Sequence, residues 1–198
     1  MHPYENIPLP VAGYVLAAWL IALHLWMLLK PEESKKFLIG LPRNKVLGPW
    51  LMGIGMAWFW LLIAPEGLGI ISSLTMELGD FNKAKRPLQF LVPFAAAGMI
   101  LHVKEFLTVR GLGLIALMAA APLLASAWQD PPLSRLLVPI IAYAAVFKGL
   151  FWVGMPYTMR DAITWATKTN SRYKLLSLGG LGYGIAVLAC SILFWQGC

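Results

Sequence analysis

Long runs of apolar residues, separated by short polar segments, dominate the chain. Six of these runs approach the roughly 20 residues that a helix needs to cross about 30 Å of hydrocarbon. They cover residues 9–29, 46–64, 88–103, 111–128, 136–155 and 175–195. The pattern predicts an all-α, polytopic membrane protein whose six transmembrane helices form three hairpins in one integral membrane domain, residues 1–198.

Two apolar segments need a separate interpretation. Residues 67–79, GLGIISSLTMELG, are too few to span a bilayer, so we expect an interfacial or re-entrant helix there. The first run, residues 9–29, has no Lys or Arg before it. It is also longer than the apolar region of a signal peptide, so we expect it to be retained as a membrane span.

Composition supports a membrane protein. Apolar residues make up 59% of the 198 residues and charged residues only 13%, whereas soluble domains carry about 25% charged residues. The short polar segments leave no room for a separate soluble domain. The net charge is +7, but the basic residues lie between the apolar runs, where they are typical orientation signals. We therefore expect contact with the lipid bilayer and no binding of nucleic acid.

Basic residues are unevenly divided between alternate polar segments. Eleven fall on one side of the predicted membrane and four on the other, while Lys148 lies within the fifth run. The eleven are Lys30, Lys35, Lys36, Arg43, Lys45, Lys104, Arg110, Arg160, Lys168, Arg172 and Lys174. Because basic loops stay in the cytoplasm, both termini are predicted to lie outside.

The first and last cytoplasmic turns share a pattern. In each, a proline follows a span, a basic residue comes four positions later and an aliphatic residue seven positions later. These residues are Pro31, Lys35 and Leu38 in the first turn and Pro156, Arg160 and Ile163 in the last. Proline suits the first turn of a helix, and the other two positions share one helical face. The pattern predicts a short amphipathic surface helix in each turn. It arises either from an internal repeat or from chance similarity between two amphipathic turns.

Four ionisable residues lie in or near the predicted spans. Lys148 is eight residues before Pro156, about 12 Å below the inner surface. His24 is at a similar depth in the first hairpin, and His102 shares a helical face with Glu105. The four residues are able to converge in the inner half of the bundle, and intramembrane charges often mark functional sites.

Several interpretations of this predicted polar cluster remain open. His24 and His102 are candidate axial ligands for haem or chlorin, and the cluster is a candidate proton or ion relay. Alternatively, each histidine forms a hydrogen bond to a neighbouring helix. Lys148 either extends toward the membrane surface, forms a structural pair, or binds a substrate.

Small residues at helical spacing indicate close contacts between helices. Gly180 and Gly184 form a Gly-xxx-Gly pair in the last span, and Gly53 and Ala57 form a similar pair in the second. The fourth span contributes the pair Ala116 and Ala120. Cys190 and Cys198 are about 12 Å apart along one helix, too far for a disulfide. No metal site is predicted.

The segment from Lys148 to Leu188 resembles the YjeT-like proteins, which are small two-helix proteins of the bacterial inner membrane. The matching residues are Gly149, Leu150, Pro156, Arg160, Ile163, Arg172, Lys174, Gly179 and Gly180. Lys148 stands where that family tends to carry an acidic residue. The resemblance covers about a fifth of the chain and implies a bacterial inner-membrane setting, without implying an activity.

No catalytic residue is predicted, because the sequence contains no Gly-x-Ser-x-Gly motif, paired acidic motif or phosphate loop. The short loops and few intramembrane charges favour a non-catalytic subunit or scaffold of a larger bacterial inner-membrane complex, with other membrane protein subunits as partners. One alternative is a small transporter or permeation protein that uses His24, Glu105 and Lys148. Another is a haem- or pigment-binding membrane protein, while an intramembrane enzyme remains open.

Overall fold

The computed structural model describes residues 7–65, 71, 74–103, 105–128 and 132–196. Over these residues the protein is all-α, with eight α-helices and short 3-10 segments. In chain order they are α1 (Leu9–Leu29), α2 (Pro31–Gly40), η2 (Leu41–Arg43), α3 (Leu47–Leu62), η4 (Gly79–Ala84), α4 (Lys85–His102), α5 (Leu107–Ser126), η5 (Leu133–Leu136), α6 (Leu137–Gly154), α7 (Tyr157–Thr167) and α8 (Asn170–Leu193).

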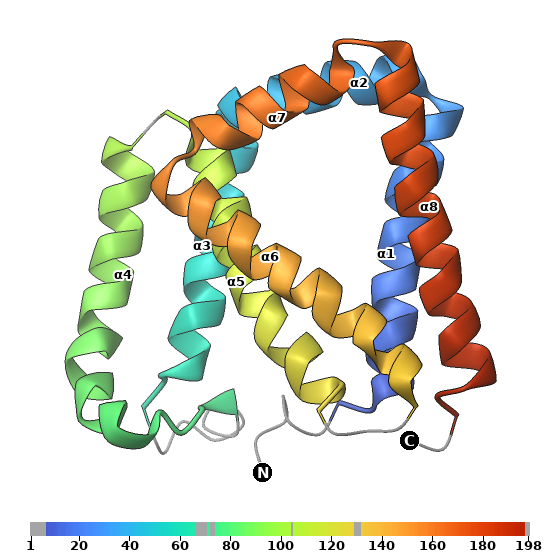
Figure 1. Ribbon diagram of the computed structural model, residues 1–198. Coiled ribbons are helices and arrows are strands. Elements are labelled where there is room, and N and C mark those ends of the chain that lie inside the picture. The colour runs from blue at the N-terminus through green and yellow to red at the C-terminus, as the bar shows by residue number, and fades with distance from the viewer. Residues whose placement is uncertain (1–6, 66–70, 72–73, 104, 129–131, 197–198) are drawn as a thin grey trace.

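The helices form two groups that are joined at one end of the molecule. Helices α1 and α8 run antiparallel as one pair, and α3, α4, α5 and α6 form the other group (Figure 1). Helices α2 and α7 lie across the top and connect the two groups, while α1 begins and α8 ends at the opposite end. Helices α6, α7 and α8 thus make three sides of a triangle.

Four helical segments are long and apolar enough to cross a membrane: α1, α5, Leu133–Gly154 and α8. A fifth candidate exists if Pro31–Arg43 and Leu47–Leu62, which are bent by 69° relative to each other, count as one broken span. The prediction of six spans is therefore wrong, because the described residues contain four or at most five candidates.

Length and composition explain this difference. Helix α3 has 16 residues and rises only about 24 Å, less than the ~30 Å of bilayer hydrocarbon. Helix α4 has 18 residues, but it begins with Lys85 and Arg86, and Gln89 and Pro93 interrupt its apolar sequence. The sequence pattern located both helices and overestimated how well each is suited to cross a bilayer.

Some of the sequence predictions fall on residues that are not described. These are Lys104, Cys198 and much of the predicted interfacial helix, residues 67–70 and 72–73. The described residues 75–78 of that segment are not helical. There the Met76 N–H donates to the Leu62 carbonyl at 2.8 Å, so the chain folds back on the end of α3.

Glycines allow α1 and α8 to pack closely. A Cβ atom added at Gly184 would lie 3.0 Å from side-chain atoms of Leu20 and Ile21, and one added at Gly180 would overlap the His24 ring. Both glycines of the predicted Gly-xxx-Gly pair therefore face α1. Small residues permit this approach of two backbones within a membrane.

Helices α5 and α6 also meet at glycines. A Cβ added at Gly113 would lie 2.9 Å from the Gly149 carbonyl oxygen, and one added at Gly149 would lie 2.8 Å from the Gly113 carbonyl oxygen. Helix α3 joins this group at Gly111, where an added Cβ would lie 2.7 Å from the Met52 nitrogen. Glycines thus fix the spacing of α3, α5 and α6.

Two side chains join α4 to α3. The Trp60 indole N–H donates to the Gln89 carbonyl at 3.0 Å, and the Gln89 amide donates to the Ile63 carbonyl at 2.7 Å. Pro93 has no N–H to donate to the carbonyl of Gln89, four residues earlier in α4. The indole of Trp60 thus supplies the hydrogen bond that the proline removes.

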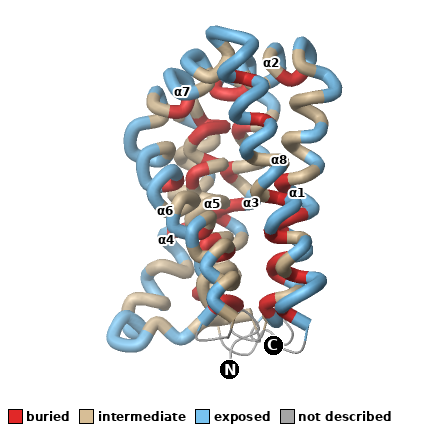
Figure 2. Tube along the Cα trace, turned by 45° about the vertical axis from the view of Figure 1, so that its right-hand side comes forward, coloured by how far each residue is buried: buried red, intermediate tan, exposed pale blue. Residues whose placement is uncertain are grey.

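The structure confirms a helix in each of the two basic turns, as α2 and α7. The aliphatic residues of the shared pattern, Leu38 and Ile163, pack against one cluster with buried Leu41, Val109 and Met159. Figure 2 shows buried residues along α1, α8 and α5, whereas α4 is mostly exposed or half-buried. The two turns therefore form a continuous roof over the end of the bundle.

Candidate functional site

A cavity of about 430 Å³ lies below α7, between α6 and α8. Helix α6 contacts α8 at its first turn, where the Tyr183 hydroxyl donates to the Leu137 carbonyl at 2.6 Å. Further along, α6 diverges from α8 toward the opposite end of α7 (Figure 1). The divergence opens the cavity, and α7 covers one end of it.

The cavity wall is mainly apolar and comes from five helices. It includes aromatic side chains of α6 (Phe147, Phe151 and Trp152), Leu38 of α2 and Ile163 of α7. Helices α1 and α8 complete the wall. Leu38 and Ile163, which occupy equivalent positions in the two basic turns, therefore both line the roof of this cavity.

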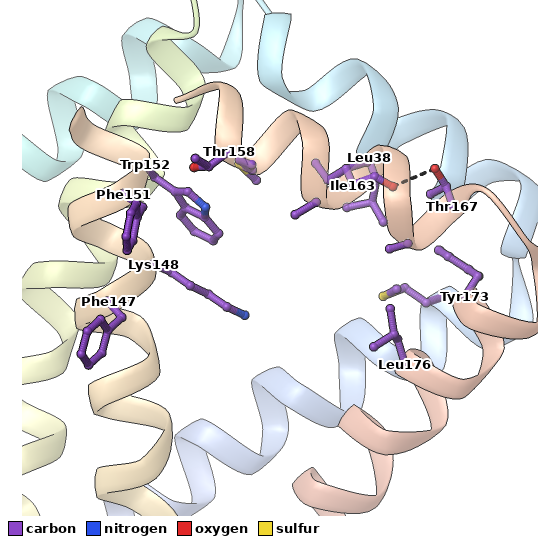
Figure 3. A pocket seen from close by; sticks show the side chains of 14 residues that line it. Leu38, Phe147, Lys148, Phe151, Trp152, Thr158, Ile163, Thr167, Tyr173 and Leu176 are labelled. Atoms are coloured by element: carbon purple, nitrogen blue, oxygen red, sulfur yellow. Dashed lines mark hydrogen bonds between the residues drawn. The ribbon is translucent and has the colours of Figure 1, made fainter. Parts of the chain in front are cut away.

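Of the described residues that line this cavity, Lys148 is the one with a charged side chain. Its side chain extends from α6 into the open space between α6 and α8 (Figure 3). Within the part of the chain that the structure describes, the Lys148 ammonium makes no hydrogen bond or ion pair. The arrangement is an isolated cation in a cavity with an apolar wall.

The polar side chains in the wall are engaged elsewhere. Thr158 donates to the Met155 carbonyl at 2.7 Å, and Thr167 donates to the Ile163 carbonyl at 2.8 Å. The Tyr173 hydroxyl lies 2.6 Å from Ser34 Oγ. These hydroxyl groups stabilise the turns and do not pair with Lys148.

His24 lies between α1 and α8, not in the cavity wall. Its Nδ1 is 2.8 Å from the Leu20 carbonyl of the same helix. A carbonyl only accepts hydrogen bonds, so Nδ1 carries the hydrogen and Nε2 is left toward Gly180. Because Gly180 occupies this side of the ring, a haem iron has no room at Nε2 while α1 and α8 stay packed.

His102 and Glu105 are exposed at the end of α4 and in the loop that follows it. The His102 Nδ1 is 3.1 Å from the carbonyl of Gly98 in its own helix. Helices α4 and α1 lie on opposite sides of the molecule (Figure 1). His24 thus lies at the contact between α1 and α8, Lys148 in the cavity wall, and His102 and Glu105 at the exposed end of α4. Among the described residues, no three His, Cys, Asp or Glu side chains are grouped as metal ligands.

The second predicted small-residue pair faces outward. Gly53 and Ala57 line an open groove on α3 together with Pro49, Trp50 and Ile54, and a Cβ added at Gly53 meets no atom within 4 Å. In the fourth span, Ala120 is buried and Ala116 is half-buried. Within the described residues, Gly53 and Ala57 thus border an open groove on α3, and Gly53 does not face another helix.

Sequence reasoning missed the residues that join the two basic turns. Lys35 donates to the Asn170 side chain, and its ammonium lies 5.3 Å from the centre of the Tyr173 ring. The buried Nε of Arg110 has no hydrogen-bond partner among the described residues. No local pattern marks these contacts, because the partners are far apart in the sequence.

No family model matches the chain, and no curated protein or solved structure matches it. The resemblance of residues 148–188 to the YjeT-like proteins stays a prediction from the sequence.

Proposed function

We propose that this chain is a non-catalytic subunit of a larger membrane complex, and that a transmembrane helix of another polypeptide packs against α3 and α4. The observation that carries the proposal is the surface of α4. Of the α4 residues, all of which are described, Val92 alone is buried. Phe90 and Phe94 are 72% and 76% exposed on a helix that is not apolar enough to count as a membrane span. A partner helix would cover these aromatic side chains.

The groove on α3 supports the same proposal. Gly53 and Ala57 are one helical turn apart and leave the backbone of α3 accessible, while Trp50 and Ile54 form apolar walls. Small residues at this spacing allow a second helix to approach closely in a membrane. The groove and the exposed face of α4 therefore offer a partner two adjoining surfaces.

The proposed setting is the bacterial inner membrane, with α2 and α7 on the cytoplasmic side and both termini outside. Basic residues concentrate on the turns that hold α2 and α7, including Lys36, Arg43, Lys168 and Lys174. The positive-inside rule assigns such turns to the cytoplasm. The resemblance of the last hairpin to the YjeT-like proteins supports a bacterial membrane.

The mass of the intact particle tests the subunit proposal. The protein is extracted from its native membrane in mild detergent and weighed without denaturation. We expect a particle far above 21.8 kDa that contains other polypeptides in a fixed ratio. A lone chain or a homo-oligomer would overturn the proposal.

A pair of glycine substitutions tests the groove itself. Gly53→Leu fills the groove and is expected to release the partner. Gly182→Leu is the matched control, because Gly182 also lies in an apolar helix with no atom within 4 Å of an added Cβ. Equal particle masses for both variants and the unmodified protein would exclude the groove as the interface.

A second candidate function is a small transporter or permeation protein, favoured by the isolated Lys148 in the cavity. In reconstituted vesicles, Lys148→Met is expected to abolish the flux of an anionic substrate if the cavity is on its route. A scaffold would instead keep its assembly and the activity of the whole complex in the same variant. The flux in vesicles and the assembly of the complex, measured on this variant, therefore distinguish a transporter from a scaffold.

A further inference from the structure

The position of Lys148 is energetically unfavourable in a membrane unless an anion accompanies it. Lys148 is six residues before the end of α6 at Gly154, about 9 Å along the helix axis. Charged side chains at such a depth are costly and usually pair with another group. Figure 3 shows the side chain running across the open space rather than along α6 toward α7. In this conformation the ammonium points into the opening between α6 and α8 and away from the roof formed by α7.

The described part of the chain does not supply the missing anion. Glu32 and Glu33 pair with Lys35 and Lys30, and Asp161 pairs with Arg160. The hydroxyl groups in the cavity wall bond to their own turns or, for Tyr173, to Ser34. Glu77, Asp80 and Glu105, the other described carboxylates, do not line the cavity, so an anion that compensated Lys148 would come from outside these residues.

The cavity has the size and lining of a site for one hydrocarbon chain. Its volume of about 430 Å³ lies in the lower half of the ~300–1,000 Å³ range of small-molecule sites. Phe147, Phe151, Trp152 and Leu176 offer apolar contacts on two sides of the opening. Since α6 and α8 diverge, the cavity opens between these two helices.

We propose that this cavity binds a long-chain fatty acid, with the carboxylate paired to Lys148 and the hydrocarbon chain lying between α6 and α8. A fatty acid supplies the two features that the site requires, one anionic group and one apolar chain. A diacyl phospholipid brings a second chain and a bulkier headgroup, which fits a cavity of this volume less well. The inference is independent of the proposed subunit function. Like the transporter alternative, it assigns a role to Lys148, but it requires only that the fatty acid binds and not that it is transported.

Equilibrium binding of oleate to the full chain in nanodiscs of zwitterionic phosphatidylcholine tests this proposal. We expect saturable binding with one oleate per chain, and at least tenfold weaker binding of the uncharged methyl ester. Lys148→Met should weaken oleate binding at least tenfold and leave the methyl ester unaffected, whereas Lys148→Arg should retain the preference for the anion. A negative result would count against fatty-acid binding alone. The particle mass and the flux still test the subunit and transporter functions separately.

Two control variants distinguish the cavity from general charge effects. Lys174→Met removes one positive charge from exposed α8 surface outside the cavity wall, and we expect oleate binding to be unchanged. Ala162→Phe leaves Lys148 in place but puts a large side chain into the cavity from α7. It should weaken binding of oleate and of its methyl ester alike.

Three results would overturn the proposal. The first is equal oleate affinity in the unmodified protein and Lys148→Met. The second is equal affinity for oleate and its methyl ester. The third is tighter binding of phosphatidylglycerol than of oleate, measured by the same titration, which would assign the cavity to a phospholipid headgroup.

Discussion

Single residues compensate for the irregular parts of these helices. Pro93 removes a hydrogen bond from α4, and a tryptophan on α3 restores it through the carbonyl of Gln89. Gly180 makes room for the His24 ring between α1 and α8. In both cases one side chain is matched to a particular backbone position on a neighbouring helix.

Trp60→Phe is expected to destabilise the protein by about 1–3 kcal/mol, because the Gln89 carbonyl then lacks a donor. Trp50→Phe is the matched control, since Trp50 is 70% exposed on the same helix. The free energy of unfolding in detergent measures the difference. Equal stability of the two variants would contradict the role assigned to the indole N–H.

Gly180→Ala is expected to destabilise the α1–α8 pair by about 1–3 kcal/mol through overpacking against His24. Gly179→Ala should be neutral or stabilising, because an added Cβ there meets no atom within 4 Å. Thermal unfolding of both variants tests the contrast. Adding His24→Ala should recover much of the loss in Gly180→Ala, and no recovery would show that the ring is not the obstacle.

At the scale of elements, the roof depends on a buried contact between α2 and α8. Ser34 Oγ donates to a carbonyl of its own turn, with the Lys30 oxygen at 2.8 Å. The hydroxyl has one hydrogen, so the Tyr173 hydroxyl donates to Ser34 Oγ at 2.6 Å. This bond connects the two basic turns, which are 139 residues apart in the chain.

Tyr173→Phe is expected to cost about 1 kcal/mol and to loosen α2 from α8. Because trypsin cleaves after Lys and Arg, faster cleavage near Lys36 in the folded protein would report the loosening. Tyr157→Phe is the control, since the exposed Tyr157 hydroxyl contacts only the nearby Met155 sulfur among the described residues. Unchanged cleavage in Tyr173→Phe would argue that packing alone holds α2.

At the scale of the whole molecule, the helices place the two basic turns together, while α1 begins and α8 ends at the opposite side (Figure 1). The cavity exists because α6 is tied to α8 at one end only and α7 bridges the other. The exposed faces of α3 and α4 lie in the other helix group, away from the α1–α8 pair. The fatty-acid site and the proposed subunit interface are therefore separate surfaces.

Labelling with a membrane-impermeant thiol reagent tests the orientation, in a chain with Cys190→Ala and Cys198→Ala. A cysteine at exposed Lys168, beside α7, should react from the cytoplasmic side only. A cysteine at exposed Gln196, beyond the end of α8, should react from the opposite side only. Reaction of both from one side would contradict the arrangement in which α8 crosses the membrane.

The sequence determined the all-α class, the positions of the long helices and the two amphipathic turns. Hydrophobic periodicity and proline positions are local, and helix formation depends largely on local hydrogen bonds. The same pattern overestimated the number of spans, because α3 is three residues shorter than its apolar run and polar residues lower the hydropathy of α4. Gly180 and Gly184 were recognisable as contact residues because their spacing is itself a local signal.

Only the tertiary structure decided which polar residues meet. It assigned His24 to Gly180, paired Trp60 with Gln89, and left Lys148 alone in the cavity. The physical reason is that these relationships depend on the directions of α1, α6 and α8, which packing between distant segments sets. The sequence shows how far a residue lies from the end of its helix. It does not show which residue of a neighbouring helix lies opposite.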